Sequence, residues 1–301
     1  MAAGITAAAP GIAPGAAALA GEPDITLIRP ARTTSRARRI PLTRIQLPRI
    51  PRLALRAIGP IAVIALWQWV CVAKVVSSDE VVPPTAVLSA ARQLWDQGAL
   101  QSNLLISLQR VAEGLALGVA VGVFLAVICG LFRIGEDLLD PVIQAARAVP
   151  ILGLVPLAII WFGVGEEPKV ILIALGCTFP VYLNTYAAIR NVDLKLVEAG
   201  QTFGLRKWGL VRKIILPGAL PGFLVGLRFA LVGAWIIDVV AEEINAQSGL
   251  GYLINQAQTT NQLGIMFLCL ALYAIFGLLS DAIVRLLERY LLTWRRAFKG
   301  A

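Results

Sequence analysis

The chain has 301 residues, of which 58% are hydrophobic and only 15% are charged, and its formal net charge is +9. Soluble domains usually carry about 25% charged residues, so the composition excludes an ordinary soluble domain and indicates a protein of the lipid bilayer. The basic residues gather beside the apolar stretches, where membrane topology explains them. We therefore expect membrane lipid, and not nucleic acid, as the partner of this charge.

The residue types that are missing also exclude several kinds of site. The chain has no histidine, which removes histidine-based catalytic triads, general bases and metal sites. The cysteines are far apart, each in an apolar stretch and without a CxxC motif, so they are expected to be small buried hydrophobes; they are Cys71, Cys129, Cys177 and Cys269. We expect no catalytic residue and no metal ligand in this chain.

The N-terminal segment, residues 1–56, differs from the rest. Its first part is mostly alanine, glycine and proline, and residues 29–56 then hold nine arginines among prolines. Such a composition cannot bury a core, so we predict a disordered basic tail. Two roles stay open for it, attraction to anionic lipid and anchoring of the topology.

Apolar stretches of roughly 20 residues, enough to cross a bilayer, recur along the remaining chain. We predict six helical spans, over residues 57–76, 111–132, 140–162, 168–188, 218–240 and 264–286. A short surface helix after Pro84, capped by Thr85, should lie between the first two. Two spans carry glycines at intervals of four, which favour close helix contacts; these are Gly114, Gly118 and Gly122, and Gly218, Gly222 and Gly226.

The third predicted span is irregular. Asp140 followed by Pro141 is typical of an N-cap and first helical residue, so this span should begin there. Pro150 and Pro156 lie inside it and should kink it, which is tolerable where protein or water satisfies the freed carbonyls.

The distribution of charge predicts the topology. The N-terminal tail, the loop between the fourth and fifth spans, and the C-terminal segment 288–301 are strongly basic, whereas residues 242–263, after the fifth span, hold no basic residue and a Gly249–Gly251 turn. Because cytoplasmic loops carry an excess of Lys and Arg, both termini and the basic loop should be cytoplasmic.

The basic loop reads EAGQTFGLRKWGLVRKIILP over residues 198–217. Good helix formers over 195–203 predict a helix that Gly204 breaks, and a second short helix follows over 206–214. Proline disfavours helix at the residue before it, so Leu216–Pro217 should end that second helix. The segment is thus predicted as a helix-turn-helix on the membrane surface, although its charges alone would also suit an ordinary basic loop.

The spacing of this segment resembles the "EAA" loop of permeases from bacterial ATP-binding-cassette (ABC) importers. That loop reads E-A-A, three residues, G, nine residues, then I-x-L-P, and this chain departs from it only where Gly200 replaces alanine. In that family the loop is the coupling helix that docks into a groove on a separate ATPase subunit. The resemblance implies this role for Glu198, Ala199, Gly200, Gly204, Ile214, Leu216 and Pro217.

The resemblance extends over about residues 103–287. The stretches 147–163, 179–193 and 216–242 look like the permease subfamily for nitrate, sulfonate, taurine and bicarbonate, with the aliphatic sulfonate permeases nearest. It implies an all-α, type I ABC importer permease of the plasma membrane, with six spans and a cytoplasmic coupling helix. The permease domain would be 103–287, preceded by the first span and an extracytoplasmic segment over 57–102 and followed by a cytoplasmic tail over 288–301.

The resemblance also implies the partners. They are ABC ATPase subunits, an extracytoplasmic substrate-binding protein and a second permease copy. The chain holds no G-x-x-x-x-G-K-[ST] motif, so we expect no cofactor in it and ATP on the partner ATPase.

Two arginines inside predicted spans are candidates for the substrate path. Arg147 and Arg228 each lie ten or eleven residues from the cytoplasmic side, about 15 Å deep at ~1.5 Å per residue. A charge at the bilayer centre costs at least ~2.5–3.5 kcal/mol, so each should face protein or water. Guanidinium groups pair well with oxyanions, which favours an anion path. The alternatives are internal pairing, for instance of Arg228 with Asp238 or Glu242, and simple anchoring of the helix.

We therefore expect a permease subunit that moves a small anion, an aliphatic sulfonate before nitrate, taurine or bicarbonate. The competing hypothesis from another class is a polytopic membrane enzyme. The missing histidine and the lack of a polar catalytic cluster speak against that enzyme.

Overall fold

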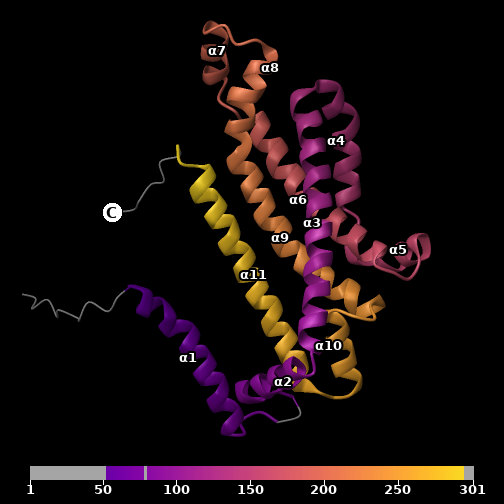
Figure 1. Cartoon of the computed structure of the whole chain (residues 1–301). Coiled ribbons are helices and arrows are strands. Elements are labelled where there is room, and N and C mark those ends of the chain that lie inside the picture. The colour runs from indigo at the N-terminus through magenta and orange to yellow at the C-terminus, as the bar shows by residue number, and fades with distance from the viewer. Residues whose placement is uncertain (1–51, 78–79, 295–301) are drawn as a thin grey trace, which may run out of the picture. The chain divides into compact units, whose positions relative to one another are not determined.

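A computed structural model describes residues 52–77 and 80–294, and all regular structure in these residues is helical (Figure 1). The predicted tail lies outside the described residues except for 52–56, which already belong to the first helix. The last seven residues of the C-terminal segment, 295–301, also lie outside them.

The helices follow one another as α1 Arg52–Val72, α2 Pro84–Asp96, α3 Ala99–Leu131, α4 Arg133–Arg147, the 3₁₀-helix η1 Ile151–Leu154, α5 Val155–Phe162, α6 Glu167–Arg190, α7 Leu194–Thr202, α8 Lys207–Leu210, the π-helix η2 Val211–Ile215, α9 Leu216–Asn245, α10 Leu250–Thr259 and α11 Leu263–Leu291. Four helical stretches of the described residues are long and apolar enough to cross a membrane: α3, α6, Lys207–Ile244 and α11. The bent pair of α4 with η1–α5 can supply a fifth, and α1 contributes the shorter apolar helix Ile58–Val72. These six pieces correspond to the six predicted spans.

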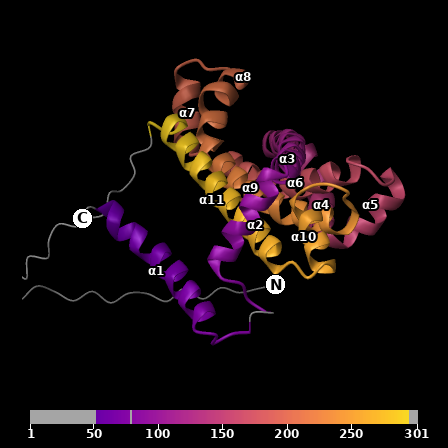
Figure 2. The same ribbon diagram turned by 60° about the horizontal axis from the view of Figure 1, so that its bottom comes forward.

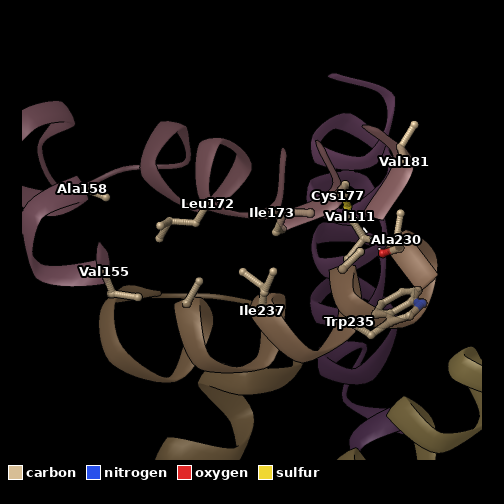
Figure 3. Close-up of a cluster of buried hydrophobic side chains, with 12 residues drawn as sticks. Val111, Val155, Ala158, Leu172, Ile173, Cys177, Val181, Ala230, Trp235 and Ile237 are labelled. Atoms are coloured by element: carbon tan, nitrogen blue, oxygen red, sulfur yellow. Dashed lines mark hydrogen bonds between the residues drawn. The ribbon is translucent and has the colours of Figure 1, made fainter. Parts of the chain in front are cut away.

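The core lies where α3, α6 and α9 pack together. Its buried side chains include Val111 from α3, Ile173 and Cys177 from α6, and Trp235 and Ile237 from α9 (Figure 3). Burial of such side chains is worth roughly 1.5–3 kcal/mol each, so this cluster holds the three helices as one unit. It forms where the apolar stretches of α3, α6 and α9 meet, beside the crossings at which glycine allows close approach.

The predicted close contact at the spaced glycines is confirmed. A β-carbon at Gly118 of α3 would lie 2.4 Å from the carbonyl oxygen of Ala174 on α6. A β-carbon at Gly222 of α9 would lie 2.3 Å from the Cβ of Ala188, also on α6. Only hydrogen fits at these crossings, so α6 lies directly against the backbones of both neighbours. The contact is looser at Gly218, where the nearest atom would be 3.3 Å away.

The prediction for the start of the third span is wrong. α4 begins at Arg133, and Asp140 lies in its middle, where its carboxylate accepts hydrogen bonds from Tyr182 Oη at 2.6 Å and Gln144 Nε2 at 3.1 Å. Pro141 is accommodated inside the helix. The chain instead breaks at Pro150, and α4 meets η1–α5 at 84°. The expected proline kink is thus a sharp corner that divides the segment into two short helices.

Two smaller expectations are also corrected. The N-cap of α2 is Pro83, and Thr85 lies inside that helix without capping it. α3 begins at Ala99, twelve residues before the predicted span, because the helix continues through residues 101–110, which mix polar and apolar side chains. This extension brings Arg110 inside the helix.

Candidate functional site

The helix-turn-helix at residues 194–215 confirms the predicted local structure. Asp193 caps α7, and its Oδ1 accepts a hydrogen bond from the backbone N–H of Lys195 at 2.9 Å. Gly204 then takes φ +81°, a conformation that other residues adopt only with strain. The backbone N–H of Leu205 reaches back to the carbonyl of Gly200 at 3.0 Å, which closes the end of α7. The turn into α8 therefore depends on glycine at position 204.

Gly200, the one departure from the "EAA" spacing, joins the two arms of this segment. It is buried, and a β-carbon there would lie 2.5 Å from Ile214 Cδ1 and 2.9 Å from Leu210 Cδ2. The side chains of Ile214 and Leu210 thus occupy the room that alanine would need. Two positions of the spacing, 200 and 214, are brought together by this packing, which fixes α7 against α8 and η2.

The outer surface of α7 and α8 is open and partly apolar. Phe203 is 87% exposed, Trp208 74% and Leu194 73%. Glu198 and Ala199 are exposed on the same helix, and Glu198 makes no ion pair in the described part of the chain. Large exposed apolar side chains beside charged ones are typical of a surface that binds another protein.

The predicted end of the second short helix at Leu216–Pro217 is wrong. α8 passes through η2 directly into α9, and Pro217 lies in the first turn of α9. The residues are helical without interruption over Lys207–Ile244, so the surface segment and the long span form one element. α7 and α8 lie at one end of α9, and α10 follows its other end (Figure 2).

At that other end lies a buried polar cluster centred on Arg110 of α3, whose side chain is 3% exposed. Its Nη1 donates to Glu242 Oε1 at 2.5 Å and to the carbonyl of Ser248 at 2.8 Å. Its Nη2 donates to Glu166 Oε1 at 2.7 Å and to Ser248 Oγ at 3.3 Å, and its Nε donates to Glu166 Oε2. All five donors of the guanidinium are used, which leaves this buried charge fully paired.

Glu242 of α9 is fully buried and joins four helices. Its carboxylate accepts hydrogen bonds from Arg110 and Ser107 of α3, the latter at 2.8 Å, and from the backbone N–H of Gly251 in α10 at 2.8 Å. Tyr273 of α11 approaches it at 3.4 Å. A β-carbon at Gly249, where φ is +115°, would lie 2.3 Å from this carboxylate. The predicted Gly249–Gly251 turn is misplaced, because the chain bends over 247–249 and Leu250 already begins α10; Gly249 makes room for Glu242 at the start of that helix.

Glu166 and Lys169 complete the cluster at the start of α6. Lys169 is buried, and its Nζ donates to the carbonyl of Gly165 and lies 3.7 Å from Glu166 Oε1. The side chain of Glu166 is 61% exposed, and its hydrogen bonds with Arg110 hold the pKa of its carboxyl below the usual range. An open cavity of about 200 Å³ adjoins Arg110 and Glu166; it is lined by Ile106, Gln109, Arg110, Glu113, Glu166 and Ser248.

Sequence reasoning missed this cluster because Arg110 was placed just outside a span. The signal available was a pair of opposite charges, Arg110 and Glu242, each beside a long apolar run at the same predicted side of the membrane. Charges in such places usually pair with one another.

The two predicted path arginines are on different helices. Arg228 of α9 pairs with Asp281 at 3.2 Å and Glu288 at 2.9 Å, both on α11, so the alternative of internal pairing was right in kind and wrong in the partners named. Asp238 is fully buried, and neither of its oxygens has a hydrogen-bond partner in the described residues. Arg147 is the exposed last residue of α4 and makes no ion pair in that same part of the chain.

Comparison with known proteins identifies the family of this chain. Residues 118–292 match the model of the binding-protein-dependent transport system inner membrane component. A Bacillus subtilis protein named as an aliphatic sulfonates transport permease, SsuC, is 40% identical over 80% of this chain and 87% of its own length. The Escherichia coli SsuC is 42% identical over 79% of this chain and 91% of its own.

A solved amino acid ABC transporter has the same fold. One of its chains superposes with a TM-score of 0.56 at 19% identity and covers 66% of this chain and 97% of that one. The expected all-α permease architecture is thereby confirmed, as is a transport subunit in place of an enzyme. The chain belongs to the family of inner membrane components of binding-protein-dependent transport systems.

Proposed function

We propose that this chain is the permease subunit of an ATP-driven importer that carries a small anion, an aliphatic sulfonate, across the plasma membrane. The observation that carries the proposal is the segment α7–Gly204–α8, which presents exposed Phe203 and Trp208 at the end of a long span. The choice of sulfonate rests on the names of the two SsuC relatives.

The coupling role is proposed for Glu198, Ala199, Gly200, Gly204, Ile214, Leu216 and Pro217. An ATPase that binds α7 and α8 would move a helical stretch of 38 residues, which at ~1.5 Å per residue is about 57 Å long. Because α7 is packed onto this stretch through Gly200, movement at one end reaches the other without an intervening joint of loose chain. Such a rigid-body shift is a known way to alternate access in transport proteins.

The remaining partners and the orientation follow from the same family membership and from charge. ATP is proposed to bind to two partner ATPase subunits, and a binding protein would deliver the anion on the side of α10. A second permease copy would complete the pathway around the 103–287 domain. The termini would be cytoplasmic, since the basic residues of the α7–α8 segment mark that side.

We propose Arg147 and Arg228 as residues of the anion path. The two differ in whether their guanidinium groups are free to bind an anion. Arg147 is exposed and free of ion pairs in the described residues, so it can attract an anion directly. Arg228 is held by Asp281 and Glu288 and could bind an anion only when that pairing opens. Unchanged uptake per inserted protein in both Arg147→Ala and Arg228→Ala would end this part of the proposal.

The test of the whole function is reconstitution with the ATPase and the binding protein. The complex should take up ethanesulfonate in an ATP-dependent way, and taurine, nitrate and bicarbonate should be compared in the same vesicles. Faster uptake of one of these three would show that the cargo is that anion and would leave the importer function supported. Failure of any ATPase to copurify with the chain would instead overturn the coupling role proposed for α7 and α8.

A further inference from the structure

The cluster at Arg110 has the construction of an anion site that is closed by a side chain of the protein itself. We propose that Arg110 and Lys169 form a binding site for a small oxyanion, a sulfonate or carboxylate, which enters when the Glu166 carboxylate leaves. This rests on the proposed function only for the choice of methanesulfonate as probe.

The geometry of Arg110 divides its donors into two sets. Nη1 and one N–H of Nη2 are used by Glu242 and Ser248, which lie on α9 and in the turn before α10. Nε and the second N–H of Nη2 point together at the two oxygens of Glu166. This parallel pair is the fork by which arginine binds any anion with two suitably spaced oxygens. The first set of hydrogen bonds fixes the orientation of the guanidinium. The second set, from Nε and Nη2, is the one that an anion could accept in place of Glu166.

Burial separates the permanent members of the cluster from the exchangeable one. The side chains of Arg110 and Lys169 are 3% and 4% exposed, and Glu242 is fully buried, whereas Glu166 is 61% exposed. Glu166 also lies outside the helical core, directly after the loop that contains Gly163 and Gly165. Among these four residues, Glu166 is therefore the one whose side chain already reaches solvent and can turn fully into water.

The charges then require a replacement. Without Glu166 the charged members are two cations, Arg110 and Lys169, and one anion, Glu242, which leaves a net charge of 2 − 1 = +1. Asp238 lies near the cluster on α9, but it is fully buried and neither of its oxygens has a hydrogen-bond partner in the described residues, so its neutral form is favoured and it adds no negative charge. An unpaired buried charge is strongly unfavourable, so the opened site favours an anion from solution. Glu113 also lines the cavity, but it is exposed, accepts a hydrogen bond from Gln109 and is screened by water.

The space available limits the size of the anion. The cavity beside the fork has a volume of about 200 Å³ and is open to solvent. Pockets for drug-sized ligands measure roughly 300–1,000 Å³, so this one suits an anion of a few heavy atoms. Ser248 Oγ and Gln109 Nε2 are polar groups at its wall, and Ile106 can face a short alkyl group.

The test is chemical rescue in the purified full chain. Glu166→Ala removes the internal carboxylate, and Glu113→Ala removes a carboxylate from the same cavity that does not touch Arg110. Thermal unfolding is measured in sodium methanesulfonate, sodium acetate and sodium chloride at equal ionic strength. We expect methanesulfonate and acetate to raise the midpoint of Glu166→Ala by about 2–4 °C over chloride, and to leave Glu113→Ala and the unaltered protein unchanged.

A second variant identifies the donors. Glu166→Ala combined with Lys169→Gln should lose most of the rescue by methanesulfonate, because one of the two cations is gone. Should Glu166→Ala be too unstable to purify, Glu166→Gln serves in its place, since it keeps the shape and removes the charge. Equal midpoints in methanesulfonate and chloride for the Glu166 variants would overturn the site. That result would leave the transport function untouched, because no transport is measured.

Discussion

Substitution of Glu242 by alanine tests whether the buried cluster holds the adjoining ends of α3, α9 and α10 together. The carboxylate has no exposed surface and accepts hydrogen bonds from α3 and α10, including those of Ser107, Arg110 and the Gly251 N–H. Its removal leaves these buried donors without an acceptor. We therefore expect a large loss of stability from a side chain that touches no proposed partner protein.

The magnitude follows from what Arg110 keeps. Removing one partner of a buried ion pair usually costs about 3–5 kcal/mol. Arg110 retains Glu166 and Ser248 in this variant, so the lower end, ~3 kcal/mol, applies. At ~2–4 °C per kcal/mol for a protein of this size, the midpoint of thermal unfolding should fall by about 6–12 °C.

The assay is thermal unfolding of the detergent-purified full chain, with Glu243→Ala as the matched control. Glu243 is the next residue, is only partly buried and takes part in none of the ion pairs of the described chain. Glu242→Gln keeps a hydrogen-bond acceptor, so its unfolding midpoint should lie between those of Glu242→Ala and Glu243→Ala. A midpoint for Glu242→Ala that equals that of Glu243→Ala would refute the reasoning, because it would mean that Arg110 is satisfied without Glu242.

Three further predictions concern the ends of the bundle. Gly204→Asp should reach the membrane at the normal level but lose the ATPase in pull-down, since a side chain is strained at φ +81°. The control Gly209→Ala should retain the ATPase. Normal transport by Gly204→Asp would contradict the coupling role of this segment. A cysteine at Gln258 should react with an impermeant reagent from outside and one at Lys207 should not, and the reverse pattern would invert the topology. Because Arg110 lowers the pKa of Glu166, its stabilising contribution should be present above about pH 4.5 and disappear as the pH falls through the lowered value. The midpoints of the unaltered protein and Glu166→Gln should therefore converge in acid, and a constant difference would contradict the ion pair.

The parts that sequence predicted correctly are those decided by neighbouring residues. The turn at Gly204 and the helices beside it follow from local propensity, because glycine adopts a positive φ without the strain of a side chain and is common where helices end. The tight crossings at Gly118 and Gly222 follow from a spacing that sets small residues on one helical face. In both cases the information lies within one or two turns of helix.

The parts that sequence missed depend on contacts between distant segments. Arg110 finds Glu166 and Glu242 at separations of 56 and 132 residues, and no local pattern specifies that pairing. The start of α4 was misplaced because Asp140 followed by Pro141 satisfies the rule for a helix start, while Tyr182 of α6 engages that aspartate from across the bundle. Tertiary packing overrode a correct local preference there.

The proline that ends the "EAA" spacing gains a different meaning from the structure. Pro217 lacks the N–H that an α-helix would direct at residue 213, and its ring would crowd that carbonyl. The helix widens over Val211–Ile215 into a π-turn, whose hydrogen bonds skip one residue further, and continues without a break. A turn of this kind changes the direction in which the following and preceding side chains face. Ile214 lies in that turn and packs on Gly200, so the orientation of α7 on α9 is set jointly by the proline and the glycine. The spacing therefore encodes a rigid connection between the proposed docking surface and the span, and a connection of this kind is what the proposed force transfer from an ATPase requires.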